Sequence, residues 1–433
     1  MEKIQAIRGM NDVLPDASPR WQYLERITRA LLHAWAYREI RFPVLEQTQL
    51  FKRSIGEVTD IVEKEKYTFD DRNGDSLSLR PEGTAGCVRA AEQHGLLYNQ
   101  TQRLWYMGPM YRHERPQKGR YRQFHQVGVE TFGMAGADIE AELLLLCAEL
   151  WKELRVAPHV QLEVNNIGAS SERARYGVAL RDYLLPLRDR LDEDSRRRLD
   201  SNVLRILDSK VPSTRELLID APVLDQFLSA ESRAGFARLL ALLDNAGVAY
   251  RLNPALVRGL DYYNGLVFEW TTDKLGAQAT VCAGGRYDGL AKQLGGSDTP
   301  AVGFAFGMER LLLLLEETGA LPAGLERTVA VYLAVIGDDV QLQGQALLLG
   351  RELRQALPGV GILTHCGGGK YNAQLKKAFA AGASVAVILE GEGLQNSVKV
   401  KVLADGGTTT ELAPGQVARW LRDNLKLLGG TLQ

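Results

Sequence analysis

The sequence predicts an α+β protein, and three observations carry that prediction. Strand-like segments with hairpin patterning recur before residue 169 and again over 250–317. Between them, residues 169–247 are rich in Arg, Asp, Glu, Leu and Ala at helical spacing, which indicates an inserted helical subdomain. Beyond a linker at 318–326 that carries Gly and Pro, strands and helices alternate, as they do in a small α/β domain. We therefore expect two domains, 1–327 and 328–433.

Composition limits the possible classes of protein. A chain of 433 residues is long enough for about two to four domains, each with its own core. Its 45% hydrophobic and 24% charged residues are ordinary for a globular protein. The formal net charge of -1 shows no overall basic excess, so any contact with RNA must come from local patches.

The cysteines and the N-terminus bear on the cellular compartment. The four cysteines are scattered and form no CxxC pair, which argues against both a zinc site and a disulfide framework. Residues 1–8 carry charges without an apolar run, so they do not resemble a signal peptide. No apolar stretch approaches the length of a membrane span. We expect a cytoplasmic protein with reduced thiols and no membrane partner.

The N-terminal region begins with a predicted helix and a predicted hairpin. Residues 19–37 have helical periodicity, with one apolar face made of Trp21, Leu24, Ile27, Leu31 and Leu32. Residues 40–45 are short, apolar and partly β-branched, which predicts a strand, and Pro43 suggests an edge or interface position. Residues 67–79 alternate around Asp-Arg-Asn-Gly at 71–74, a hairpin pattern.

The remaining elements follow the same patterns. In the first domain we expect strands at 103–111, 123–132, 250–256 and 266–272, a helix at 139–154, a glycine-rich segment at 283–289, and a strand running into a helix over 301–317. In the second we expect strands at 329–336, 362–365, 384–389 and 398–403, with helices at 341–356, 372–381 and 415–425. Such alternation predicts a largely parallel or mixed sheet.

A basic loop joins the strands at 103–111 and 123–132. Five cations fall within eleven residues of this loop: Arg112, Arg115, Lys118, Arg120 and Arg122. Like charges at this density repel one another unless an anion is expected. Arg112 follows a strand, where a guanidinium can be aimed at a phosphate, and Glu114 can orient it or accept from an adenine amino group. The alternative is a solvated hairpin tip.

Two further regions combine glycine or turns with polar side chains. In 301–310, two glycines permit close approach of a ligand, and Arg310 lies near a helix start that favours anions; the alternative is an ordinary core strand and helix. Glu82 and Thr84 lie in a turn after a strand. Arg258, Asp261 and two tyrosines fall within six residues, either as packing residues or as polar walls of a pocket.

Together these segments resemble the three signature motifs of class II aminoacyl-tRNA synthetases. Common nucleotide-binding fingerprints, GxxxxGK[ST] and GxGxxG, are missing from the sequence. The three motifs correspond to Arg41-Phe42-Pro43, the basic hairpin at 103–126, and Gly303–Arg310. Residues 7–12, 256–263 and 282–289 are similar to stretches found in histidyl-tRNA synthetases. The resemblance covers nearly the whole chain.

The resemblance implies a fold and partners. It implies a six-stranded antiparallel catalytic sheet flanked by helices, a homodimer with Pro43 at the interface, and a C-terminal α/β anticodon-binding domain at 328–433. The substrates would be L-histidine, ATP with Mg²⁺, and tRNA(His). No metal-ligating side chains are predicted. This chain departs from the family pattern at Ala378-Phe379-Ala380, where Ala-Asp-Lys is usual, and at Leu266, where a small polar residue is usual.

The resemblance also implies residue roles. The expected ATP contacts are Arg112, Glu114, Arg120, Phe124 and Arg310. The expected histidine contacts are Glu82, Thr84, Gln126, Glu130, Arg258, Tyr262 and Tyr263. The expected contacts to the tRNA acceptor end are Arg115, Gln117, Lys118 and Arg122. Arg112 and Arg258 are the expected catalytic residues, because both would contact the reacting α-phosphate.

Three other interpretations remain open. One is a non-catalytic paralogue that regulates histidine biosynthesis; such paralogues typically lose the C-terminal domain and several ATP-contacting residues, which this chain retains. The second is a synthetase for another amino acid of the same subclass, such as proline, threonine or glycine. The third is an RNA-binding or uncharged-tRNA-sensing module.

Overall fold

The chain forms two compact units in a computed structural model. The structure describes residues 3–55, 65–209, 211–257, 260, 262–276, 279–391, 397–403 and 407–425. The first unit comprises Met1–Val13 and Trp21–Leu321, and the second comprises Leu14–Arg20 and Pro322–Gln433. The division after residue 321 falls in the Gly- and Pro-containing linker, whereas the assignment of the short segment before residue 21 has no counterpart in the sequence patterns.

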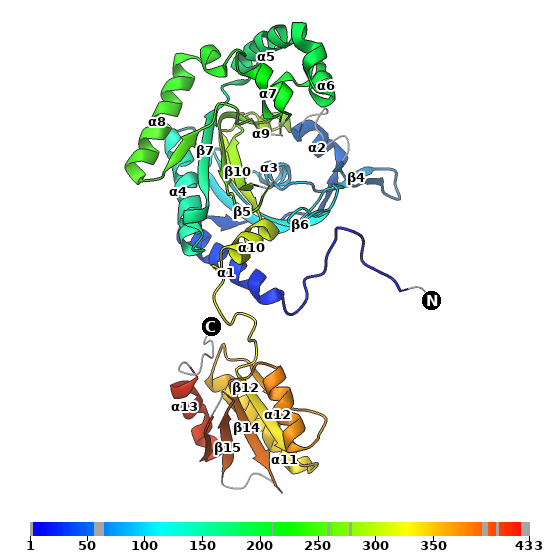
Figure 1. The fold of residues 1–433 in the computed structure, drawn as a ribbon, viewed down its shortest axis with the longest axis vertical. Coiled ribbons are helices and arrows are strands. Elements are labelled where there is room, and N and C mark those ends of the chain that lie inside the picture. The colour runs from blue at the N-terminus through cyan, green and yellow to red at the C-terminus, as the bar shows by residue number, and fades with distance from the viewer. Residues whose placement is uncertain are drawn as a thin grey trace. The chain divides into compact units, whose positions relative to one another are not determined.

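A large sheet forms the centre of the first unit (Figure 1). Its strands, in spatial order, are β1 (Arg38–Glu39), β5 (Gln102–Tyr111), β6 (Gln123–Phe132), β11 (Ala301–Gly307), β10 (Thr280–Arg286), β9 (Asn264–Thr271), β7 (Gln161–Asn166) and β8 (Tyr250–Leu252). The six strands from β5 to β7 are all antiparallel. The expected six strands are therefore present, but the sheet has eight, because short strands pair in parallel with each edge.

Glycines let three central strands and their side chains approach closely. The predicted glycine-rich segment begins within strand β10, where a Cβ at Gly284 would overlap the carbonyl oxygen of Gly303. A Cβ at Gly303 of β11 would overlap the Oε2 of Glu130 on β6. Absence of side chains at these positions therefore makes room for a buried carboxylate on the sheet.

Helices cover the sheet. The first unit contains α1 (Ser18–Ala34, from Trp21 onward), α2 (Thr48–Ile55), α3 (Thr84–Gln93), α4 (Ala137–Glu153), α9 (Leu290–Gln293) and α10 (Met308–Glu317). Trp151 of α4 packs edge-to-face on Trp270 and Phe306 of the sheet. Cys87 and Val88 of α3 join a separate buried cluster with Tyr106. The strand-to-helix transition expected over 301–317 is confirmed as β11 followed by α10.

The segment after α1 differs from the sequence prediction. Residues 40–45 were expected to form one strand, but 40–44 lie outside strands, and β2 (Leu45–Gln47) belongs to a second sheet with order β2-β4-β3. Pro43 lacks an N–H donor, which disfavours a continuous ladder here. Arg80 instead donates to the carbonyl oxygen of Phe42 at 3.1 Å. The expected hairpin is confirmed as β3 (Thr68–Asp70) and β4 (Ser76–Leu79).

The helical insertion contains α5 (Ser170–Leu184), α6 (Glu193–Ser201), α7 (Pro212–Leu218) and α8 (Ala230–Ala246), joined by short 3₁₀ segments. Residues 169–209 and 211–247, as the structure describes them, contain no strand. Tyr176, Leu180 and Leu184 of α5 form its small core with Leu199 and Leu217. The helical character predicted from composition and spacing is thus present.

The second unit has a mixed five-stranded sheet. Its order is β13 (Ile362–Thr364), β12 (Val331–Ile336), β14 (Val385–Glu390), β15 (Val398–Val402) and β16 (Thr409–Leu412). The first three strands are parallel and the last two antiparallel, and the helices are α11 (Val340–Ala356), α12 (Tyr371–Ala380) and α13 (Pro414–Asn424). Strand β16 was missed by the sequence analysis. Among the described residues, no helix is both long and apolar enough to span a bilayer.

Candidate active site

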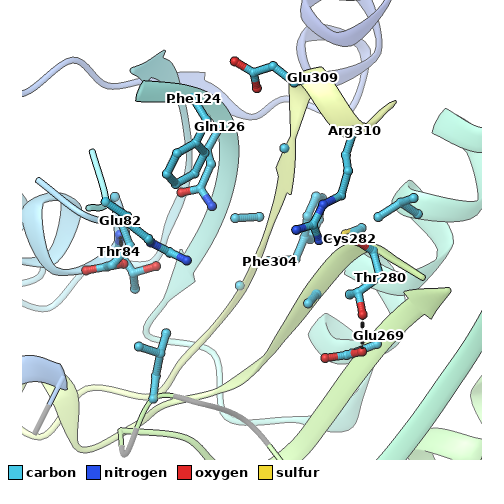
Figure 2. A pocket seen from close by; sticks show the side chains of 18 of the residues that line it. Glu82, Thr84, Phe124, Gln126, Glu269, Thr280, Cys282, Phe304, Glu309 and Arg310 are labelled. Carbon is cyan, nitrogen blue, oxygen red and sulfur yellow. Dashed lines mark hydrogen bonds between the residues drawn. The ribbon is translucent and has the colours of Figure 1, made fainter. Parts of the chain in front are cut away.

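A cavity of about 320 Å³ lies on the central sheet of the first unit. Strands β5, β6, β9, β10 and β11, the turn before α3, and the start of α10 supply its walls. Figure 2 shows Glu82 and Thr84 on one side, with Arg310, Thr280 and Glu269 on the other. We call the side with Glu82, which also carries Glu130, the acidic side, although the opposite side has a carboxylate of its own in Glu269.

Glu130 is the most enclosed charged group of the acidic side, with 1% of its surface exposed. Its Oε1 accepts hydrogen bonds from Thr84 Oγ1 at 2.8 Å and from Tyr106 OH at 3.0 Å. Its Oε2 accepts one from the hydroxyl of Tyr287. Burial raises the pKa of Glu130 to about 7, against these hydrogen bonds, which lower it.

Tyr106 reaches Glu130 through a gap between two glycines. A Cβ at either Gly83 or Gly128 would overlap the Tyr106 ring. These glycines come from different elements, the turn before α3 and strand β6, so the ring is enclosed from two directions. This packing fixes the phenol and hence its hydrogen bond to Glu130.

A second carboxylate, Glu82, lies beside Glu130. It accepts from the backbone N–H groups of Thr84 at 2.6 Å and Ala85 at 3.0 Å, at the start of α3. Burial raises its pKa, and hydrogen bonds from Ala85 and Thr84 oppose that rise. The Oε1 of Gln126 on β6 is buried with no hydrogen-bond partner among the described residues. A buried acceptor of this kind is suited to a donor supplied by a ligand.

Aromatic rings form a further wall of the acidic side. The Tyr262 and Tyr263 rings lie 4.7 Å apart, and Tyr287 lies 5.6 Å and 6.4 Å from them. Arg286 and Asp288, which flank Tyr287, form an ion pair at 3.1 Å. Arg286 also pairs with Glu140 of α4, while Asp288 accepts from Asn264. This network holds the Tyr287 segment next to the sheet.

Backbone carbonyls hold two arginines of the cavity, Arg112 beside the Glu82 turn and Arg310 on the other side. Arg112 Nε donates to the carbonyl oxygen of Pro81 at 2.8 Å, and its guanidinium lies 5.2 Å from the Phe124 ring centroid. Arg310 Nη1 donates to the carbonyl oxygen of Thr280 at 2.7 Å. Burial lowers the pKa of Arg310, and Arg120 and Arg112 add to that effect. These fixed guanidinium groups are suited to bind an anion bidentately.

The basic loop carries side chains of two kinds. Glu114 is buried and forms an ion pair with Arg120, and both line the cavity. Arg115, Gln117 and Lys118 are exposed, and Lys118 pairs with Glu317 of α10 at 2.8 Å. Arg122 is half-buried, and its Nε donates to the carbonyl oxygen of Glu114 at 3.2 Å. Arg122 thus stabilises the loop through the backbone of Glu114.

Most residues singled out by sequence line this one cavity: Glu82, Thr84, Arg112, Glu114, Arg120, Phe124, Gln126, Glu130, Tyr262, Tyr263 and Arg310. Arg258 lies outside the described residues. Sequence reasoning missed Tyr106, Glu269, Thr280, Cys282 and Tyr287 as lining residues. Tyr287 falls inside the 282–289 segment that drew attention, but a lone tyrosine in a strand, such as Tyr106, carries no pattern that marks a pocket.

A family model for histidyl-tRNA synthetases matches residues 9–311, which include every cavity-lining residue. This chain belongs to the histidyl-tRNA synthetase family. The apo histidyl-tRNA synthetase of S. aureus is 32% identical, with a TM-score of 0.79, over 96% of this chain and 99% of that one. The α+β fold of class II synthetases is therefore confirmed.

Two more distant structures share the fold. A histidyl-tRNA synthetase from Nostoc sp. PCC 7120 is 19% identical, with a TM-score of 0.72, and the match covers 98% of this chain and 100% of that one. A Bacillus halodurans protein described as an ATP phosphoribosyltransferase regulatory subunit/histidyl-tRNA synthetase is 21% identical, with a TM-score of 0.63, over 91% of this chain and 100% of that one. Because such a fold accompanies both descriptions, the site must decide the chemistry of this family member.

Proposed function

We propose that the protein is a histidine–tRNA ligase. It activates L-histidine with ATP to histidyl-adenylate and pyrophosphate, then transfers histidine to the 3′-hydroxyl of the terminal adenosine of tRNA(His). The observation that carries this proposal is a cavity that brings buried carboxylates together with two arginines held by backbone carbonyls. A nucleotide phosphate and an amino acid can meet there.

The carboxylate of the bound histidine is the nucleophile, so no side chain need serve as one. It attacks the α-phosphorus, and negative charge builds up on the phosphoryl oxygens. Arg112 stabilises that charge at the α-phosphate, Arg310 binds the γ-phosphate, and Arg258 spans the carboxylate and the α-phosphate. Glu114 accepts from the adenine amino group, Phe124 stacks on the base, and Arg120 contacts ATP through the same loop.

The acidic side would select histidine. Glu82, Thr84 and Gln126 bind the α-amino group; the Oε1 of Gln126 lacks a partner among the described residues, and the Thr84 oxygen retains lone pairs. Glu130, Tyr262 and Tyr263 contact the imidazole, which offers one donor and one acceptor when neutral. Ligands that leave such buried groups unpaired are rejected by a factor of about 10⁴, which makes editing unnecessary.

Mg²⁺ fits this cavity as a companion of ATP. It prefers oxygen ligands and keeps several waters, binding through one or two carboxylates and the substrate phosphates. Glu269 lines the arginine side of the cavity and accepts from Thr280 Oγ1 at 2.7 Å. Glu269 would hold the ion, which neutralises phosphate charge when bound.

RNA would contact two further regions. Arg115, Gln117 and Lys118 are exposed on the basic loop and would bind the acceptor end of the tRNA. Arg122, which is half-buried in the same loop, would contribute to this contact. Residues 1–327, with the insertion at 169–247, form the proposed catalytic domain. Residues 328–433 form the proposed anticodon-binding domain. Phe379, at the departure from the family pattern, is exposed on α12, where it could alter RNA contacts.

We propose a homodimer located in the cytoplasm, where ATP and tRNA are found. Pro43 is exposed between β1 and β2, and the apolar side chains of Leu45 and Phe69 are exposed on the neighbouring three-stranded sheet. Exposed apolar groups on one small sheet are suited to bury against a second copy. Light scattering of the purified protein tests the proposed dimer directly.

ATP–pyrophosphate exchange with each of the amino acids tests the activity. Exchange stimulated by histidine alone, followed by charging of tRNA(His), is the expected result. The alternative is a catalytically inactive regulatory subunit of histidine biosynthesis, favoured by the likeness to the Bacillus halodurans protein. No exchange with any amino acid from a folded protein would support that alternative, and exchange with proline, threonine or glycine would support a different specificity.

A further inference from the structure

We infer that the hydroxyls of Thr84, Tyr106 and Tyr287 keep Glu130 ionised, as a fixed acceptor for an imidazole N–H. Tyr106 and Tyr287 are then positioning residues, which act on histidine through Glu130. This inference rests on the proposed function, because it assumes that Glu130 contacts the imidazole. It adds to that function the three hydroxyl groups that determine whether Glu130 is charged when it contacts the imidazole.

The hydrogen-bond geometry carries the argument. An ionised carboxylate offers about four acceptor positions, two on each oxygen. Thr84 and Tyr106 occupy both positions on Oε1, and Tyr287 occupies one on Oε2. One position on Oε2 remains for a donor from the ligand. If Glu130 were protonated, the proton would take that remaining position on Oε2, and the carboxyl would donate to the ligand there instead of accepting from an imidazole N–H.

The charges around Glu130 make those hydroxyls necessary. The titratable groups that face it are acids that carry no positive charge at any pH: Glu82, Cys87, Tyr106, Tyr262 and Tyr287. Burial raises the pKa of Glu130 to about 7, and the main effects that oppose this rise are hydrogen bonds from Tyr287, Thr84 and Tyr106. These hydroxyl donors hold the ionised form of Glu130 in reach of neutral pH, and losing one of them raises the pKa further.

Tyr106→Phe is the test, because it removes one donor and keeps the ring that fills the gap between Gly83 and Gly128. The quantity to measure is the KM for histidine of the variant divided by that of the wild type, across pH. Titration of free histidine affects both enzymes equally and cancels in this ratio. What remains is the ionisation of Glu130 in the free enzyme.

We expect the ratio to be near one at about pH 9, where Glu130 is ionised in both enzymes, and to rise to roughly tenfold at about pH 6, a shift of about one pKa unit. The KM for ATP should stay constant. Tyr287→Phe should behave in the same way. A ratio that is raised equally at every pH would show a merely structural role and overturn the inference. A ratio below one at high pH would show that Glu130 works protonated, which also overturns it.

Two further variants separate this inference from the proposed function. Tyr176→Phe, a buried tyrosine in the insertion core, is the matched control and should match the wild type at every pH. Glu130→Gln should raise the KM for histidine strongly. If Glu130→Gln leaves that KM unchanged, the proposed histidine pocket is wrong. If Glu130→Gln raises it while the Tyr106→Phe ratio is flat with pH, only the present inference fails.

Discussion

Glu130 on the central sheet and Glu172 in the helical insertion both expose little of their surface, yet their pKa values move in opposite directions. Glu130 is 1% exposed and Glu172 is 4% exposed, and each accepts at least three hydrogen bonds. Burial raises the pKa of Glu130 to about 7. Burial also acts to raise the pKa of Glu172, but its hydrogen bonds outweigh that effect and lower the pKa to about 2.

The difference lies in the depth of burial, since Glu130 is deep in the first unit and Glu172 is near the surface of the insertion, and in the donors. Glu172 accepts from the backbone N–H groups of Ala169 and Ser229, which are the N-caps of α5 and α8, and from the Ser232 hydroxyl. Those two helix starts add favourable partial positive charge. Glu130 has only hydroxyl donors and lies near a second carboxylate, Glu82.

The comparison teaches how to tell a structural carboxylate from a functional one. Glu172 is fully supplied with donors and ties two helices together, so its charge stabilises the fold. Glu130 keeps an acceptor position open at a cost in stability, which is the property expected of a binding group.

The largest expected effect concerns the two arginines that are proposed to contact the reacting α-phosphate. Arg112→Ala and Arg258→Ala should each slow histidine-dependent exchange by about 10²–10³-fold, because each removes a contact to charge that develops in the transition state. Circular dichroism should show a folded protein. Exchange close to the wild-type rate in either folded variant would remove that arginine from the proposed mechanism.

Glu130→Gln tests whether Glu130, unlike Glu172, is a binding group. It should raise the KM for histidine by about 10²-fold or more, as expected when a charged hydrogen bond in a buried site is lost, with little change in the KM for ATP. Tyr263→Phe should have a smaller effect of the same kind. An effect mainly on ATP in steady-state kinetics would mean that this side of the cavity is misassigned.

The same substitution should affect stability in a pH-dependent way. A carboxyl with a raised pKa destabilises the fold as pH rises from its unfolded value, about 4.5, to its folded value, about 7. Glu130→Gln should therefore be more favourable for stability at about pH 8 than at about pH 5, by up to about 3 kcal/mol. Denaturant unfolding at the two pH values measures this difference, and equal effects at both would contradict the raised pKa.

Glu172→Gln tests the structural side. A carboxyl with a lowered pKa contributes stability above its unfolded value, and that contribution is lost as pH falls through about 2. The substitution should lower stability at neutral pH by about 1–3 kcal/mol, seen as a lower Tm, with little change in the KM for histidine. A normal Tm would show that the insertion does not depend on this charge.

The smallest effect is expected at the exposed loop. Arg115→Ala combined with Lys118→Ala should slow transfer to tRNA by a few-fold and flatten its salt dependence, because each phosphate contact releases counterions. Arg122 is left intact because its side chain supports Glu114. Single-turnover transfer from preformed adenylate, measured over a salt series, checks the prediction, with exchange as the control. An unchanged rate and slope would leave the loop as a solvated tip.

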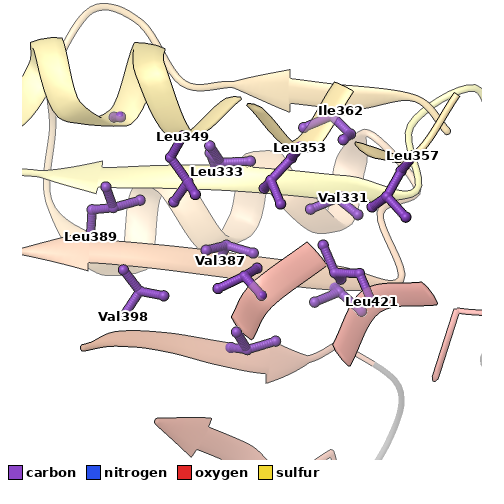
Figure 3. Packing of buried hydrophobic residues seen from close by; sticks show 14 of the residues in the cluster. Val331, Leu333, Leu349, Leu353, Leu357, Ile362, Val387, Leu389, Val398 and Leu421 are labelled. Carbon is purple, nitrogen blue, oxygen red and sulfur yellow. The ribbon is translucent and has the colours of Figure 1, made fainter. Parts of the chain in front are cut away.

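The sequence by itself located most of the elements, although α2, α3, β7 and β16 are among those it missed, and it marked the residues worth examining. Periodicity located the hairpin at 67–79, the helical insertion, and the alternating C-terminal unit, because each buries one apolar face. Figure 3 shows the outcome in that unit, where Leu349 and Leu353 of α11 pack with Val331 and Leu333 of β12. The charged loop and the motif arginines were conspicuous because they are unusual in sequence.

Only the tertiary structure decided which groups meet Glu130. Tyr106 and Tyr287 lie far from Glu130 along the chain and reach it through strand pairing and through gaps left by glycines. The eight-stranded sheet and the break at Pro43 likewise depended on pairing with β5 and on a guanidinium from Arg80. Local sequence patterns show which face of a helix or strand is buried. The depth of burial of a carboxylate, the donors that reach it and its pKa depend on residues from several elements of the folded protein. The sequence therefore could not distinguish Glu130 from Glu172.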